Sequence, residues 1–494
     1  MKAVRYQNIT HLIPLAIGIG IGALIISDFY IVNALASLFN EREMFRIIPF
    51  QVSLGIFLVA IISSLCAANI FKLDFVIRNR EKIFIILLLT GLHTIGLFPG
   101  GFDSSDIMFA AFIVLWLFSV FTTERYTVIP SPLHYFNLAL FFFAVLSSVH
   151  GGFAVIFSMA PLFKAVFMSF LIIDMVRKRE WVFFFIKVLV VITTVSAIIA
   201  IIQEAVYLQR GIILAQYNAK FVKLILETTP FGTFLRAPAF TGMHLLLANY
   251  LVLCLLIGLN VFLYFMSDMK RNARVILLAA MMLMATALVL TFSKTNIIGL
   301  SIGVLMSAII KWRNRLIHFL TLLLLLIVTS YLCGLWDLLY EYYMSQVELM
   351  GDVGHRMDLM RRGIEGFLYK HPFVGAGLGR GFEYTQDVIG WGVHNAFIRA
   401  ADDLGIFGFL VFTAMFIYVL LRLLLTIPVV KDIQEKVILI TLLTGFFAYV
   451  INIQFQPDFL SYYNWIFMGF IECTVIVFRR KYMEMNGQSL PGRI

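Results

Sequence analysis

Residues 404–425, LGIFGFLVFTAMFIYVLLRLLL, form an apolar run long enough to cross a lipid bilayer as a single helix. Similar runs recur along the chain, in which 61% of the 494 residues are hydrophobic and only 13% are charged. A soluble domain carries more charge, and a transmembrane β-barrel shows short alternating segments that this sequence lacks. The sequence therefore predicts an all-α polytopic membrane protein with about 12 to 14 transmembrane helices.

Short polar segments separate the apolar runs and set the expected order of the spans. We expect spans near residues 12–36, 47–70, 83–98, 107–121, 133–150, 153–173, 182–206, 243–266, 275–292, 296–310, 316–335, 404–425, 437–455 and 459–478. Two of them, at 107–121 and 296–310, are near the shortest crossing length, so tilted, paired or re-entrant arrangements stay open. No internal repeat or linker marks a second folded domain, so residues 1–494 are expected to form one transmembrane bundle.

Positive charge gathers in short loops on one side of the predicted spans. These loops lie at 72–82, 177–179, 270–274, 311–315, 431–436 and 479–481, and Lys2 and Arg5 precede the first span. Because short loops rich in Lys and Arg stay in the cytoplasm, both termini are expected there. The formal net charge of +10 is therefore explained by membrane topology. Once these loops are assigned, no basic and aromatic surface remains, so nucleic-acid binding is not expected.

Two long loops, at 207–242 and 336–403, fall on the opposite side and are expected to be external. The second is the one long hydrophilic island in the chain and is rich in Arg, His and Gly. Because apolar spans in lipid can do little chemistry, we expect reactive groups to gather in this loop. The four cysteines lack metal-ligand spacing, and no HExxH or acidic metal motif occurs, so neither a metal nor a cofactor is expected.

Three arginines of the large loop, Arg356, Arg361 and Arg362, lie in a segment whose composition fits an amphipathic helix along the membrane surface. The turn HPFVGAGLG follows at 371–379, where Gly375 and Gly377 permit close backbone approach to an anion or a sugar. By itself such a turn is more often structural, because its spacing fits neither a dinucleotide fingerprint nor a P-loop.

His394 and Asn395 come shortly before the run that begins at Leu404, which places the imidazole near the outer membrane surface. A lone histidine there is by default a hydrogen-bonded interfacial residue. Asp402 and Asp403 directly precede the run and are expected to cap a helix end.

Two further cations lie at the outer ends of predicted spans. Arg236 is the last charge before the span at 243–266, and Lys294 lies between two short spans. Either residue could snorkel to the interface or face a polar cavity, and position alone does not separate these two interpretations.

Together these elements resemble the O-antigen ligase and O-antigen polymerase superfamily of bacterial envelope glycosyltransferases. The family pattern is His, then Asn, Ser or Gln, nine residues, Gly, two residues, and a small residue or Tyr. His394-Asn395 with Gly405 and Gly408 matches it. Upstream family features follow in the same order: Arg236 after the first external loop, Ser293-Lys294 at a hairpin, and the Arg356 helix with its Pro-x-x-Gly-x-Gly turn. The family commonly has Ser-Arg at the hairpin, so Lys294 is a departure.

The resemblance implies a GT-C-like bundle with its active site on the outer face. Such enzymes transfer a glycan from undecaprenyl diphosphate to an acceptor hydroxyl, without a metal ion or a nucleotide sugar. His394 is then expected to be the base of an inverting displacement, and Arg236 and Arg356 to hold the diphosphate. Further substrate-binding candidates are Arg361, Arg362, Lys294, Asn395, Gly375 and Gly377.

Several functions share this motif. We expect a polymerase that joins lipid-linked repeat units in the bacterial inner membrane, alongside a flippase and a chain-length regulator. A ligase that moves the finished glycan to lipid A-core or another glycolipid acceptor is the first alternative. A lipid-linked oligosaccharide flippase or other transporter would be expected to show inverted repeats and broken helices instead of one large outer loop. A non-catalytic membrane scaffold remains the last possibility.

Overall fold

The computed structural model describes residues 73–94, 104–122, 126–148, 154–213, 226–229, 232–239, 241, 243–312, 325, 328–329, 352–380, 393–456 and 461–485. The spans predicted near 12–36 and 47–70, and most of the one near 316–335, lie outside these residues. So do parts of both predicted external loops, at 214–225, 336–351 and 381–392.

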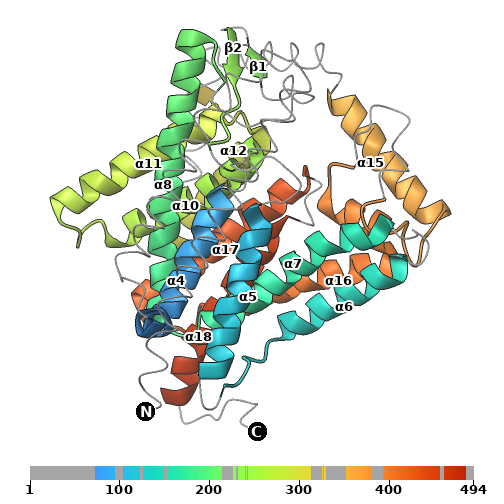
Figure 1. Ribbon diagram of the computed structural model, residues 1–494. Helices are drawn as coiled ribbons and strands as arrows, with labels where there is room; N and C mark the ends of the chain where they lie inside the picture. Colours follow the sequence, from blue (N-terminus) through green and yellow to red (C-terminus); the bar gives the residue numbers. More distant parts are fainter. Residues whose placement is uncertain are drawn as a thin grey trace. The chain divides into compact units, whose positions relative to one another are not determined.

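Helices make up nearly all of the described structure (Figure 1). They are α4 (Leu73–Thr94), α5 (Ser104–Thr122), α6 (Pro132–Ser148), α7 (Ala154–Met175), α8 (Arg179–Arg210), α10 (His244–Phe265), α11 (Arg271–Leu290), α12 (Lys294–Lys311), α15 (Asp352–Tyr369), α16 (Ala396–Thr426), α17 (Ile433–Ile453) and α18 (Tyr462–Met485). Strands β1 (Leu226–Thr229) and β2 (Gly232–Leu235) form one two-stranded sheet. Among the described helices, α8, α10, α11, α12, α16 and α17 are long and apolar enough to cross a membrane. The predicted class, an all-α polytopic membrane protein, is confirmed.

Contacts divide the described residues into two compact units. The first contains α4, α5, most of α8 and the segment Phe234–Leu247. The second contains α6, α7, the start of α8, most of α10, and the helices from α11 to α18. In the second unit α12 packs along α17, α18 along α7, and α16 along α6 (Figure 1).

Small residues set the closest of these helix contacts. A Cβ at Gly299 of α12 would come within 2.8 Å of the carbonyl oxygen of Ala448 on α17, and Gly303 one turn later faces Thr444. Gly469 of α18 faces Ser169 of α7 in the same way. Because hydrophobic burial gives little drive between helices in lipid, such close backbone approach supplies much of their association.

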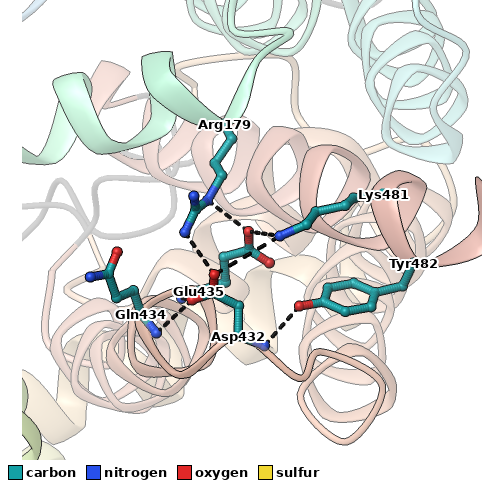
Figure 2. A network of polar contacts seen from close by, with 6 residues as sticks. All are labelled: Arg179, Asp432, Gln434, Glu435, Lys481 and Tyr482. Carbon is teal, nitrogen blue, oxygen red and sulfur yellow. Dashed lines mark hydrogen bonds and ion pairs between the residues drawn. The ribbon is translucent and has the colours of Figure 1, made fainter. Parts of the chain in front are cut away.

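A network of ion pairs ties together three helix ends in the second unit (Figure 2). Glu435 in the first turn of α17 is fully buried and pairs with Arg179 at 2.7 Å and with Lys481 at 2.9 Å. Asp432 caps α17 and also pairs with Arg179, while its N–H donates to the Tyr482 hydroxyl. The basic residues Arg179 and Lys481 belong to two loops that the charge pattern assigns to the cytoplasm, and α17 begins within a third, at 431–436. The three loops therefore meet at one end of the second unit.

Candidate active site at the start of α16

The helix α16 begins earlier than its hydropathy indicates, because Asn395 caps it. The Asn395 side-chain oxygen accepts hydrogen bonds from the N–H groups of Phe397 at 2.9 Å and Ile398 at 3.1 Å. Two of the N–H groups that a helix start leaves without partners are thereby satisfied. His394, half-buried, directly precedes this cap. The expectation that Asp402 and Asp403 cap the start of this helix is wrong, because Asn395 is its N-cap and both aspartates lie within α16, just before a kink.

A kink at Gly405 breaks α16 just after these aspartates, and the glycine-rich turn packs into it. Gly405 has φ 72° and ψ −172°, and a Cβ there would overlap the carbonyl oxygen of Phe373. A Cβ on Gly375, which has φ 77°, would likewise overlap the carbonyl oxygen of Asp403. The N–H of Ile406 donates to Pro372 O at 2.8 Å. The motif glycine Gly405 is therefore required by the approach of two backbones.

Hydrogen bonds fasten the turn further to the end of the first half of α16. The N–H of Ala376 donates to Asp402 O at 2.8 Å, and that of Gly377 to Asp403 O at 3.2 Å. The buried Asp403 carboxylate accepts from Gly379 N–H and from Arg399 Nε, both at 3.0 Å. The predicted glycines Gly375 and Gly377 therefore form the contact between the turn and α16.

The amphipathic helix α15 lies against the same end of α16. Its buried face carries Gly363, where a Cβ would approach Val393 and the Asp402 carboxylate. Arg356 lies on the same helix, two turns before Gly363. Arg361 is exposed and pairs with Glu365 at 2.8 Å, a hydrogen bond that raises the arginine's pKa. Arg362 lies between the two faces and is half-buried.

The hairpin between α11 and α12 carries the predicted Ser293-Lys294 pair. Lys294 is the first residue of α12 and is exposed, whereas Ser293 is buried and accepts a hydrogen bond from Asn296 Nδ2 at 2.8 Å. The preceding residue, Phe292, has φ 50°, a left-handed conformation that tightens the hairpin.

Three buried asparagines, which the sequence analysis missed, join this hairpin to α17. Asn452 Nδ2 donates to Asn296 Oδ1 at 2.5 Å and to Asn249 Oδ1 of α10 at 3.2 Å. Two residues further on, the Gln454 side-chain oxygen accepts from Asn395 Nδ2 at 2.9 Å. The start of α12 and the start of α16 are therefore both hydrogen-bonded to the C-terminal end of α17.

Arg236 belongs to the first compact unit. Its guanidinium pairs with Glu227, a fully buried carboxylate on β1 that the sequence analysis missed. The preceding residue is fixed as well, because Leu235 N–H donates to the buried carboxylate of Glu204 on α8 at 3.0 Å. Arg236 is thus a held, partly buried cation whose Nε finds no hydrogen-bond partner among the described residues.

Of the predicted site residues, His394 and Asn395 lie at the start of α16, whereas Gly375 and Gly377 pack against the same helix at its kink. Arg356, Arg361 and Arg362 belong to α15, which lies against this first half of α16. Lys294 is linked to the start of α16 through α12 and α17. Among the described residues no group of three His, Cys, Asp or Glu side chains is arranged to hold a metal ion.

The fold and these residues define a polytopic membrane protein with a group of polar residues where α15, the glycine turn and α16 meet. Residues 279–413, which include α12, α15 and the first part of α16, match the family model described as O-antigen ligase. The match confirms the resemblance drawn from the His394 motif. No curated protein matches the chain.

Proposed function

We propose that this protein is a glycosyltransferase that moves a glycan from undecaprenyl diphosphate to a hydroxyl group of an acceptor. The observation that carries the proposal is the capped start of α16, where His394 stands beside Asn395 inside the matched segment. A histidine held at a helix start beside arginine-bearing α15 is suited to deprotonating a hydroxyl next to a bound diphosphate.

In the proposed reaction an imidazole nitrogen of His394 accepts the proton of the acceptor hydroxyl. The hydroxyl oxygen attacks the anomeric carbon, the bond from that carbon to the diphosphate oxygen breaks, and the electron pair leaves with undecaprenyl diphosphate. Arg236 and Arg356 stabilise the negative charge that grows on the diphosphate. Arg361, Arg362 and Lys294 add to the positive electrostatic potential. One displacement inverts the anomeric configuration, and no step calls for a metal ion.

Of the functions that share this chemistry, we favour polymerisation of lipid-linked repeat units over ligation to lipid A-core or another glycolipid. The membrane is proposed to be the bacterial inner membrane, with both termini cytoplasmic and the loops at 207–242 and 336–403 external. This arrangement puts the start of α16 at the outer face. The proposal rests on the clustering of Lys and Arg in the opposite loops. A flippase and a chain-length regulator are the proposed neighbours in the pathway.

Donor-only incubation separates the two reactions. Reconstituted protein given only a short undecaprenyl-diphosphate-linked repeat should make a ladder of multiples of that repeat, because a polymerase uses one lipid-linked unit as the acceptor for another. The products are separated by gel electrophoresis and mass spectrometry. A protein that makes no ladder but transfers the repeat once lipid A-core is added is a ligase.

The arginines are expected to act as planar clamps instead of simple interfacial charges. Arg236→Lys and Arg356→Lys should each lower turnover about 30-fold, the equivalent of about 2 kcal/mol of transition-state stabilisation, because lysine lacks the bidentate fork. Arg361→Lys is the matched comparison on α15, and this exposed residue should tolerate the change. Full activity of both the Arg236 and the Arg356 variants, measured as initial transfer rates at equal protein amounts, would remove the clamp.

A further inference from the structure

The amide of Asn395 has only one orientation compatible with its contacts. Its oxygen already receives two backbone N–H groups of α16, so the amino group must point away from the helix. At that position it meets the Gln454 side-chain oxygen at 2.9 Å. Gln454 therefore serves as the acceptor that completes the cap and fixes the first turn of α16 against α17.

The end of α17 that carries Gln454 is held in place by buried groups from two other helices. It is the C-cap of α17, and its N–H donates to Ile451 O at 3.2 Å. Asn452, two residues before Gln454, is buried and donates hydrogen bonds to Asn249 of α10 and Asn296 of α12. Amide groups buried in this way are costly to move because each displaced partner loses a hydrogen bond in an apolar environment.

We propose that Gln454 is a positioning residue for the reaction, which acts through Asn395 to hold His394 at the acceptor hydroxyl. The inference rests on the proposed function, since it assigns Gln454 a role only if His394 is the base. Gln454 is half-buried and its neighbour Phe455 is exposed, so water can replace the lost contact and folding should change little. Small displacements of a catalytic group have far larger effects on rate, up to about 100-fold for about 1 Å.

The test is a double-mutant cycle that uses charge to probe the Asn395–Gln454 contact. Asn395→Asp keeps a good helix cap, and the Gln454 amide can turn to donate to the new carboxylate. Gln454→Glu keeps the acceptor for the Asn395 amino group. Gln454→Glu should therefore hold kcat within about threefold of wild type, and Asn395→Asp serves as the reference for the double variant. The double variant sets two carboxylates face to face and should lose about 30-fold or more beyond the product of the two single effects.

Two further variants separate positioning from folding. Gln454→Met keeps the size of the side chain but removes the acceptor, so kcat should fall about tenfold while the KM for the lipid-linked donor stays unchanged. Phe455→Leu, on the same turn, is the matched control and should behave as wild type. Thermal melting in detergent is followed for every variant. If the double variant does not fold, the Gln454→Met loss and its restoration in Gln454→Glu decide the question.

The outcomes are distinguishable from failure of the proposed function. If wild-type protein transfers glycan and His394→Ala does not, additive effects in the cycle or full kcat in Gln454→Met overturn the role of Gln454. If wild-type protein transfers no glycan, or His394→Ala is as active as wild type, the proposed function itself falls, and with it the role assigned to Gln454.

Discussion

Replacing His394 with alanine is expected to lower glycan transfer by about 1,000-fold or more while leaving the protein abundant in the membrane. A positioned general base contributes roughly 100- to 10,000-fold to rate, and His394 directly precedes the Asn395 cap. The half-buried imidazole contributes little packing, so the Asn395 cap and α16 should be retained. The measurement is the initial rate of polymer formation by reconstituted protein, normalised to folded protein.

His371 provides the matched control for this prediction. It is another histidine of the large loop, its side chain is exposed, and it stands at the beginning of the turn. His371→Ala should keep transfer within about threefold of wild type, because the site assigns it no proton transfer. Near-normal transfer by His394→Ala would exclude His394 as the base, and equal losses in both variants would indicate a general disturbance of the loop.

A second large effect is expected from Gly405→Ala. The new Cβ would overlap the Phe373 carbonyl oxygen, and the backbone at φ 72° and ψ −172° lies in a region that only glycine occupies readily. Strain and overlap together should cost roughly 3 kcal/mol or more, and the turn should separate from α16. Transfer should then be lost almost completely, with a lower melting temperature in detergent.

Gly211→Ala isolates the contribution of the overlap. Gly211 also has positive φ, at 64°, but a Cβ there meets no atom within 4 Å. This variant carries backbone strain alone and should lose only about 1 kcal/mol, with near-normal transfer. A Gly405→Ala protein that melts and transfers like wild type would show that the close approach of turn and kink is not required.

The helix content was predictable because apolar runs and charged loops have strong, local signals. The start of α16 was not predictable in the same way. The apolar run begins at Leu404, whereas the helix begins at Ala396, because Asn395 caps it there. The glycine turn was recognised as a close-approach element, but its partner was not, since only folding brings Gly375 and Gly405 together.

The polar residues that support the site were missed for a related reason. Asn452 and Gln454 are isolated amides in or near an apolar helix, and their partners Asn296 and Asn395 are distant in sequence. No sequence pattern singles out Glu227 either. Its ion pair with Arg236 keeps that partly buried arginine in one orientation. A sequence motif can point to candidate substrate-contacting residues, but it does not reveal the buried residues that hold them in position.

The central claim is that the protein transfers glycan directly from undecaprenyl diphosphate with His394 as base. It is tested most directly by incubating purified, reconstituted protein with a labelled undecaprenyl-diphosphate repeat unit in the presence of EDTA. The account predicts one undecaprenyl diphosphate released for each new glycosidic bond, inverted configuration at the anomeric carbon by NMR, and no product from His394→Ala. Retained configuration, dependence on an added metal ion, or glycan moved across the bilayer without bond formation would contradict it.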